Sequence, residues 1–169
     1  MRPLPAALAL VALVQPLLVG VARADPLKVG SVVPELTFED QFGASHTLTD
    51  ALKLVLFARD MDGGELVREA LATDGGPLLE SSAAAFVSDV HRMPGLIRRL
   101  VAKPRMRGRG YPMWLDESGE LTADFPAADG KVTLLVLEAR RVVRIDQLGD
   151  SAAIRTALGA PPAEPGPDH

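Results

Sequence analysis

Residues 52–65 read LKLVLFARDMDGGE, and this stretch decides the fold. Its first half, residues 52–58, is short and almost wholly apolar, which predicts a strand buried at the centre of a sheet. Its second half begins a helix, because Asp62 stands three residues before Glu65, a spacing like that of a capping box. Apolar residues then recur at helical spacing: Leu66, Val67, Ala70 and Leu71. We therefore expect a buried strand that leads directly into a helix capped by Asp62.

Two more elements follow at short intervals. The turn-forming residues 74–77 (DGGP) end the first helix, and residues 83–90 predict a second strand. Pro94 suits the first turn of another helix. The apolar face of that helix is formed by Leu96, Ile97, Leu100 and Val101, and Arg98 and Arg99 lie off this face.

The remaining segments complete a mixed sheet. Upstream, residues 36–39 alternate apolar with polar, and residues 47–48 return after a turn, which predicts a hairpin. Downstream we expect a strand at 111–115, a short helix or extended piece at 121–125, antiparallel strands at 131–137 and 142–145, and a last helix at 152–158. A βαβ half followed by a ββα half predicts an α/β fold, a mixed central sheet with helices on both faces.

This order of elements resembles the thioredoxin-like superfamily, in particular its peroxiredoxin and periplasmic thiol-reductase branches. Those proteins open with a segment similar to residues 29–48, which contains VG, PELTF, DQFG and TL, followed by a charged residue and the first core strand. The resemblance covers nearly all of residues 27–158. It implies a thioredoxin-like fold with an added N-terminal hairpin and a small insertion near residues 111–130.

The chemistry that this resemblance would imply is missing. In these families a C-x-x-C motif stands at the start of the first helix, and its cysteine positions fall on Asp62 and Glu65 here, with Gly63 and Gly64 between them. The chain contains no cysteine. It therefore has no thiol nucleophile and no thiolate metal ligand, and it is neither a thiol–disulfide oxidoreductase nor a cysteine peroxidase.

The same comparison defines a set of remnant active-site positions. Val132 takes the place of the family's cis-proline, whose loss puts docking of an extended substrate in doubt. The set is Asp60, Asp62, Gly63, Gly64, Glu65 and Val132. Asp62 and Glu65 either stabilise a helix terminus or, with Asp60, form a carboxylate cluster with raised pKa values or cation affinity, which Arg59 would neutralise. We assign no catalytic residue and no metal ligand.

Residues 56–62 (LFARDMD) are also similar to a segment of exported bacterial proteins, some of which are described as flavin dehydrogenases. The sequence contains no G-x-G-x-x-G after a strand. The nearest approach, GRG at residues 108–110, leads to no predicted helix. We therefore assign no cofactor.

The chain begins with an expected signal peptide, residues 1–24. Arg2 precedes an apolar run, and Ala22-Arg23-Ala24 matches the small-x-small pattern before a cleavage at Asp25. The run is too short and broken for a spanning helix, so we expect no membrane span after cleavage and a periplasmic or secreted protein. One domain would then occupy residues 25–159, followed by a proline-rich, disordered tail at 160–169.

Charge is distributed unevenly along the chain. Residues 25–169 contain 16 basic and 22 acidic residues, a net charge of −6 that argues against binding of nucleic acid. Residues 92–109 nevertheless contain seven basic residues and no acidic one. The patch consists chiefly of Arg98, Arg99, Lys103, Arg105, Arg107 and Arg109. It is either a solvated helix face or a docking surface for an envelope protein or an anionic ligand such as lipid headgroups.

Three hypotheses for function follow from these observations. The first is a non-catalytic binding or accessory module in the cell envelope, which uses the fold as a scaffold. The second is an enzyme with non-thiol chemistry in the remnant cleft, through carboxylates or a bound cofactor such as flavin. The third is a protein without cysteines of its own that still docks to a redox enzyme.

Overall fold

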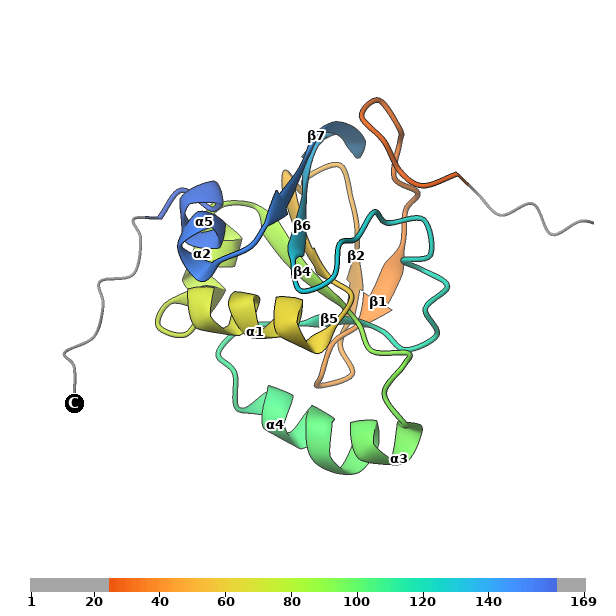
Figure 1. Cartoon of the computed structure of the whole chain (residues 1–169), viewed down its shortest axis with the longest axis vertical. Helices are drawn as coiled ribbons and strands as arrows, with labels where there is room; N and C mark the ends of the chain where they lie inside the picture. The colour runs from red at the N-terminus through yellow and green to blue at the C-terminus, as the bar shows by residue number, and fades with distance from the viewer. Residues whose placement is uncertain (1–24, 161–169) are drawn as a thin grey trace, which may run out of the picture.

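The computed structural model describes residues 25–160. The expected signal peptide and the tail after Ala160 lie outside the described residues. Seven strands form one sheet: β1 (Thr37–Glu39), β2 (Ser45–Thr47), β3 (Leu54–Ala58), β4 (Ala84–Asp89), β5 (Trp114–Asp116), β6 (Val132–Glu138) and β7 (Arg141–Leu148). The helices are α1 (Met61–Ala70), α2 (Gly75–Ser81), α3 (Gly95–Ile97), a π-helical turn η1 (Arg98–Ala102), α4 (Lys103–Arg107) and α5 (Ser151–Ala157) (Figure 1).

The strand order across the sheet is β2-β1-β5-β4-β3-β6-β7. β3 lies inside the sheet, between the parallel β4 and the antiparallel β6, so the prediction of a buried central strand is confirmed. The expected N-terminal hairpin is formed by β1 and β2, and β1 joins it to β5 through one antiparallel pair, Glu39 with Leu115. The predicted antiparallel pair near the C-terminus is β6 and β7.

The core is divided by the sheet into two clusters. One contains buried residues of α1, α2 and α5, for example Val67, Leu78 and Ile154. The other contains no helical residue among those described, because strand residues such as Phe57 pack there against Val33 and Phe125 from irregular segments. Helices on both faces were expected. The buried helical residues all belong to one face instead, since the N-terminal segment and the loop before β6 cover the other.

Helix α2 was not predicted, because Gly75-Gly76-Pro77 is typical of a turn. Close packing explains why a helix begins there. A Cβ on Gly75 would lie 2.6 Å from the Tyr111 ring, and one on Gly76 would lie 2.6 Å from the carbonyl oxygen of Gly110. These contacts come from residues more than 30 positions away, so the local sequence does not show them.

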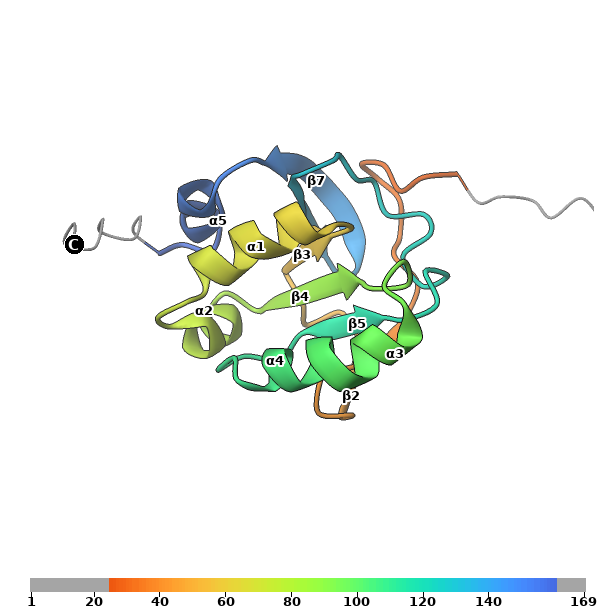
Figure 2. The ribbon, with the colours of Figure 1, turned by 60° about the horizontal axis from the view of Figure 1, so that its bottom comes forward.

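The segment α3-η1-α4, residues 95–107, is one helical run with a π-helical turn in its middle; we call it the basic helix. It lies at the edge of the molecule, below α1 in Figure 1 and brought forward in Figure 2. No helix within residues 25–160 is long and apolar enough to cross a membrane.

Candidate functional site

The candidate site is the junction between β3 and α1. β3, β4 and β5 run parallel, so their carboxyl ends meet at one edge of the sheet. Ligands of open α/β sheets bind at this edge. Only Arg59 and Asp60 connect β3 to α1, and they place the beginning of α1 directly above it.

Asp60 caps α1, which corrects the prediction that Asp62 does. The backbone of Asp60 is extended, and its Oδ1 accepts a hydrogen bond from the Gly63 N–H at 2.8 Å. Asp62 lies inside the first turn and is exposed. The capping spacing is therefore Asp60 to Gly63 rather than Asp62 to Glu65, because β3 ends at Ala58 and the helix begins at Met61.

Asp60 also connects α1 to the loop before β6. The Gly130 N–H donates to Asp60 Oδ2 at 2.8 Å, so both oxygens of one carboxylate are used. Gly63 lies against the same loop, since a Cβ there would lie 2.7 Å from the carbonyl oxygen of Lys131. We call this arrangement of Asp60, Gly63, Gly130 and Lys131 the Asp60 bridge.

The other two acidic positions, Asp62 and Glu65, are exposed and take no part in the two hydrogen bonds of the bridge. Glu65 is exposed and pairs with Arg68 one turn later, with Arg68 Nε 2.7 Å from Glu65 Oε2. This hydrogen bond lowers the pKa of the Glu65 carboxyl below its usual value. Within residues 25–160, no three histidine or acidic side chains gather in a way that could hold a metal ion. The raised pKa expected from a carboxylate cluster is wrong for Glu65.

Gly64, Val132 and Arg59 complete the sequence-predicted neighbourhood. A Cβ on Gly64 would meet open space, unlike one on Gly63. Val132 is the first residue of β6, pairs with Ala58 and is completely buried. Arg59 does not neutralise the acidic residues. Its Nη2 donates to the carbonyl oxygen of Phe125 at 2.8 Å, and its guanidinium lies 5.7 Å from the centre of the Phe57 ring.

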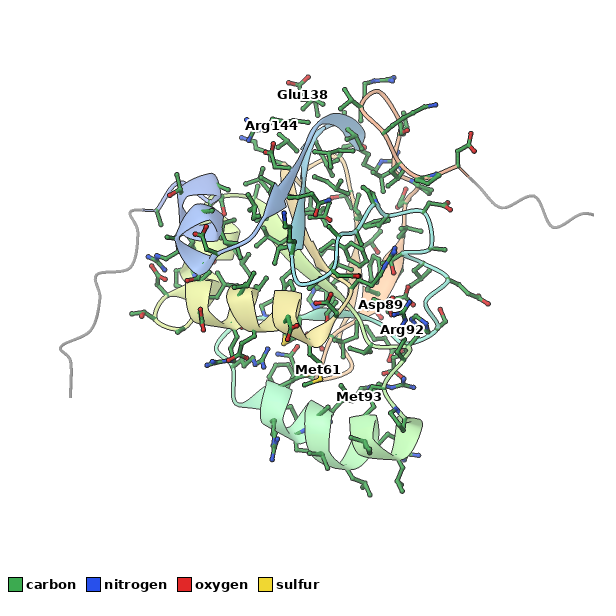
Figure 3. The ribbon with its side chains drawn as sticks, in the orientation of Figure 1. Met61, Asp89, Arg92, Met93, Glu138 and Arg144 are labelled. Atoms are coloured by element: carbon green, nitrogen blue, oxygen red, sulfur yellow. The ribbon has the colours of Figure 1, made fainter. Side chains whose placement is uncertain are left out.

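A histidine–aspartate pair at the same sheet edge was missed by the sequence analysis. His91 Nδ1 lies 2.6 Å from Asp89 Oδ1, and the Asp89 side chain is almost fully buried at the end of β4. Asp89 and Arg92 are labelled in Figure 3 above Met61 and Met93. The signal in the sequence was an aspartate two residues before a histidine where a strand ends.

The predicted basic patch separates into two groups. Arg98, Lys103, Arg107 and Arg109 each contact another part of the protein through their side chains. Arg99 and Arg105 are exposed, and within residues 25–160 their side chains form no hydrogen bond or ion pair. The structure thus divides a patch that looked uniform in sequence.

Solved structures with a similar fold include peroxiredoxins. The peroxidoxin BcpB of Mycobacterium tuberculosis superposes with a TM-score of 0.52 at 21% identity, covering 79% of this chain and 95% of that one. A peroxiredoxin-like protein of Aquifex aeolicus gives 0.52 at 8% identity, over 81% and 89% of the two chains. The chain has the thioredoxin-like fold.

Peroxiredoxin Q of Xanthomonas campestris is a third similar structure, with a TM-score of 0.50 at 15% identity over 73% of this chain and 89% of that one. No protein-family model matches the sequence, and no curated protein is significantly similar to it. At these identities the likeness establishes the fold and not the activity. This chain thus has a thioredoxin-like fold and contains no cysteine.

Within the thioredoxin-like fold, the Asp60 bridge lies next to Asp62 and Glu65, the two positions where the resemblance places reactive sulfur. The Asp60 carboxylate accepts two backbone hydrogen bonds, as a capping residue does. Such a group holds α1 against the loop before β6.

Proposed function

We propose that the chain is an exported, non-catalytic binding or accessory module of the cell envelope. The observation that carries the proposal is the Asp60 bridge. The residue at the start of α1 is a carboxylate with both oxygens in use, in a chain that has no thiol. In this proposal the fold is retained as a scaffold, and Asp60 holds the beginning of its first helix against the loop before β6.

Packing at the junction supports the same conclusion. Gly63 is buried and the backbone of Lys131 fills the space where a side chain would stand. A substrate that reached the helix terminus would have to displace this loop and break the hydrogen bonds of Asp60. Binding that begins with such losses is unfavourable unless new contacts offset them.

The assignment to the envelope rests on residues 1–24, and it has its own test. We expect protein recovered from the periplasmic or secreted fraction to begin at Asp25 by N-terminal sequencing. Protein that accumulates in the cytoplasm with Met1 retained would contradict export.

The non-catalytic part is tested on protein purified from its native compartment. We expect an absorbance spectrum set by Trp114 and Tyr111 alone and no stoichiometric metal by elemental analysis. A flavin spectrum or a bound metal at one per chain would contradict the proposal. The Asp60→Asn variant is measured beside the wild type, because asparagine keeps a capping oxygen at this position while it removes the negative charge.

A second candidate is an enzyme with non-thiol chemistry, and the His91–Asp89 pair favours it. A carboxylate that orients an imidazole is a common arrangement for a general base, and His91 is partly exposed. The discriminating variant is His91→Gln, and the matched control is His46→Gln. His46 is also paired with an aspartate, but it stacks on Trp114 near the N-terminal hairpin. Loss of a bound cofactor or of an activity in the first variant alone would favour the enzyme.

A further inference from the structure

The basic helix carries four of its large apolar side chains on the outside, whereas Met106 packs against the core. Leu96 is 72% exposed and Leu100 is 67% exposed, and Ile97 and Val101 beside them are 49% and 41% exposed. These residues are four apart in two pairs, so they share one face of the helix. An apolar stripe ordinarily faces the core of a globular protein, and this one does not.

The inward face of the helix is held by a cation and two carbonyl groups. Arg98 Nη1 donates to the carbonyl oxygens of Val90 at 3.2 Å and Met93 at 3.4 Å. Glu117 adds an ion pair to each of two residues of the helix, at 3.2 Å to Arg98 and 2.6 Å to Lys103. Polar contacts of Arg98 and Lys103 therefore hold the inward face of the helix, while the apolar stripe faces outward.

The far end of the helix is fastened in the same polar manner. Arg107 Nε donates to the main-chain oxygen of Gln41 at 3.0 Å. The side-chain amide of the buried Gln41 donates to the main-chain carbonyl oxygen of Tyr111 at 2.8 Å and accepts a hydrogen bond from the Met113 N–H at 2.8 Å. These two bonds anchor Gln41, and with it the contact to Arg107, in the body of the protein. The helix is thus held at both halves, and its outward orientation is a property of the fold.

Three cations remain available around the apolar stripe. Arg92, Arg99 and Arg105 are exposed, and within residues 25–160 their side chains form no hydrogen bond or ion pair. No acidic residue interrupts residues 92–109. The surface is therefore apolar in its middle and positively charged at its border.

We propose that the outward face of the basic helix binds the surface of an anionic lipid bilayer. Exposed leucines beside arginines are the composition of helices that lie in the bilayer interface, with apolar side chains below the headgroups and cations at their level. Outside residues 92–109, residues 25–169 contain 9 basic and 22 acidic residues, a net charge of −13. An anionic surface repels that remainder and attracts the helix, so charge also orients the protein.

A second copy of the chain suits this face less well. Two copies that met symmetrically through it would bring Arg99 and Arg105 of one copy close to the same residues of the other. Like charges at such short range oppose association. The surface therefore complements an anionic bilayer better than it complements itself.

The test uses protein purified from its native compartment and sedimentation with vesicles. We expect binding to vesicles of phosphatidylcholine and phosphatidylglycerol in equal amounts, little binding to phosphatidylcholine alone, and weakening with salt. Leu96→Ser with Leu100→Ser should weaken binding by about tenfold or more, because two large apolar side chains no longer enter the interface. Arg99→Gln with Arg105→Gln should weaken it and reduce the salt dependence.

Matched controls lie on other surfaces. Val29→Ser with Val32→Ser changes two side chains that are 63% and 51% exposed outside the helix, and it should leave binding unchanged. Arg144→Gln removes an exposed cation from β7, at the opposite end of the view in Figure 3, and should also leave it unchanged. Circular dichroism verifies that each variant is folded.

No binding to anionic vesicles, or binding that the helix variants retain, would overturn the proposal. A dimer or a complex with an acidic protein that is lost in the Leu96/Leu100 variant, without vesicle binding, would overturn it in favour of that occupant. The proposal deepens the proposed function and rests on it for the compartment. Its failure is separable, because a protein without flavin, metal or vesicle binding would retain the non-catalytic assignment and lose only the lipid surface.

Discussion

The Asp60 bridge and the basic helix are opposite solutions to the same problem, the attachment of a helix to a sheet. At the bridge, a short acidic side chain satisfies backbone N–H groups and draws α1 onto the loop before β6. At the basic helix, long cationic side chains reach inward to carbonyls and Glu117, and the apolar side chains remain in solvent. The first arrangement packs the beginning of α1 against a loop, and the second leaves an apolar helix face exposed to solvent.

This contrast supports the proposal that function lies away from the position that the fold suggests. In a thioredoxin-like fold the beginning of α1 is the first place to look for chemistry. Here Asp60 and Gly63 are hydrogen-bonded and packed at that place, although Met61 between them is exposed, and the basic helix exposes a larger group of apolar side chains. The predictions below test whether the two regions differ in this way.

The largest expected effect is at Gly63. A Cβ there would lie 2.7 Å from the Lys131 carbonyl oxygen, so Gly63→Ala must move backbone and should lower the free energy of unfolding by about 2–3 kcal/mol. Gly64→Ala is the matched control, since its Cβ meets open space and should raise stability by about 0.5–1 kcal/mol. Urea denaturation measures both. Equal effects at the two glycines would mean that α1 is not packed against this loop.

The next effect is at Asp60. Asp60→Ala removes the cap of α1 and the partner of the Gly130 N–H, so we expect a loss of about 1–2 kcal/mol. Asp62→Ala should cost less, about 0.3–1 kcal/mol, because Asp62 only interacts with the helix dipole. Thermal unfolding compares the stability of the two variants. A larger loss of stability in Asp62→Ala than in Asp60→Ala would contradict the assignment of Asp60 as the cap of α1.

A smaller effect is expected from acid at the basic helix. The hydrogen bond from Lys103 lowers the pKa of Glu117 below its usual value. A carboxyl with a lowered folded-state pKa stabilises the protein above its unfolded-state pKa, and this stabilisation is lost as the pH falls through the folded-state value. The wild type should therefore exceed Glu117→Gln in urea midpoint at pH 7, and the difference should vanish in acid, below the usual range of a glutamate.

Asp116 also has a lowered pKa. Burial alone would raise that pKa, but hydrogen bonds from Thr122, Ser118 and Gly119 outweigh the effect of burial. Because Asp116 is present in both proteins, its titration cancels in the comparison. A difference between wild type and Glu117→Gln that persists unchanged at low pH would show that the ion pairs of Glu117 do not hold the helix.

The smallest effect on stability is expected at the outward face of the basic helix. Leu96→Ser with Leu100→Ser should change the free energy of unfolding by no more than about 0.5 kcal/mol per site, because both side chains are exposed. Leu71→Ala is the contrasting change, since Leu71 is buried and its truncation should cost about 2–4 kcal/mol. A large loss at Leu96 and Leu100 would mean that the face is covered within the protein.

Much of the fold was predictable because hydrophobic runs are local signals. The buried strand at residues 54–58, its immediate passage into a helix and the C-terminal antiparallel pair all follow from periodicity and turns. Helix α2 was not predictable, since the close approach of Tyr111 that requires glycine at position 75 cannot be seen in the local sequence. The faces of the sheet were also not predictable, because irregular segments cover one of them.

The beginning of α1 was predicted close to its observed place, but its capping residue was not. Both Asp60 and Asp62 are acceptable caps by residue type, and the choice depends on where β3 ends and on Gly130, 70 residues away. For the basic helix, periodicity identifies residues that share a face, but it does not say which face is buried. Glu117 and the carbonyls of Val90 and Met93 decide that, and these contacts exist only in the folded chain.

Amide hydrogen exchange at Gly63 and Gly130, measured by NMR on the protein alone, tests the central claim most directly. If Asp60 holds both groups, their protection should approach that of amides in the core strand β3. Exchange at the rate of an open loop would show that the beginning of α1 is accessible. The non-catalytic assignment would then lose the observation on which it rests.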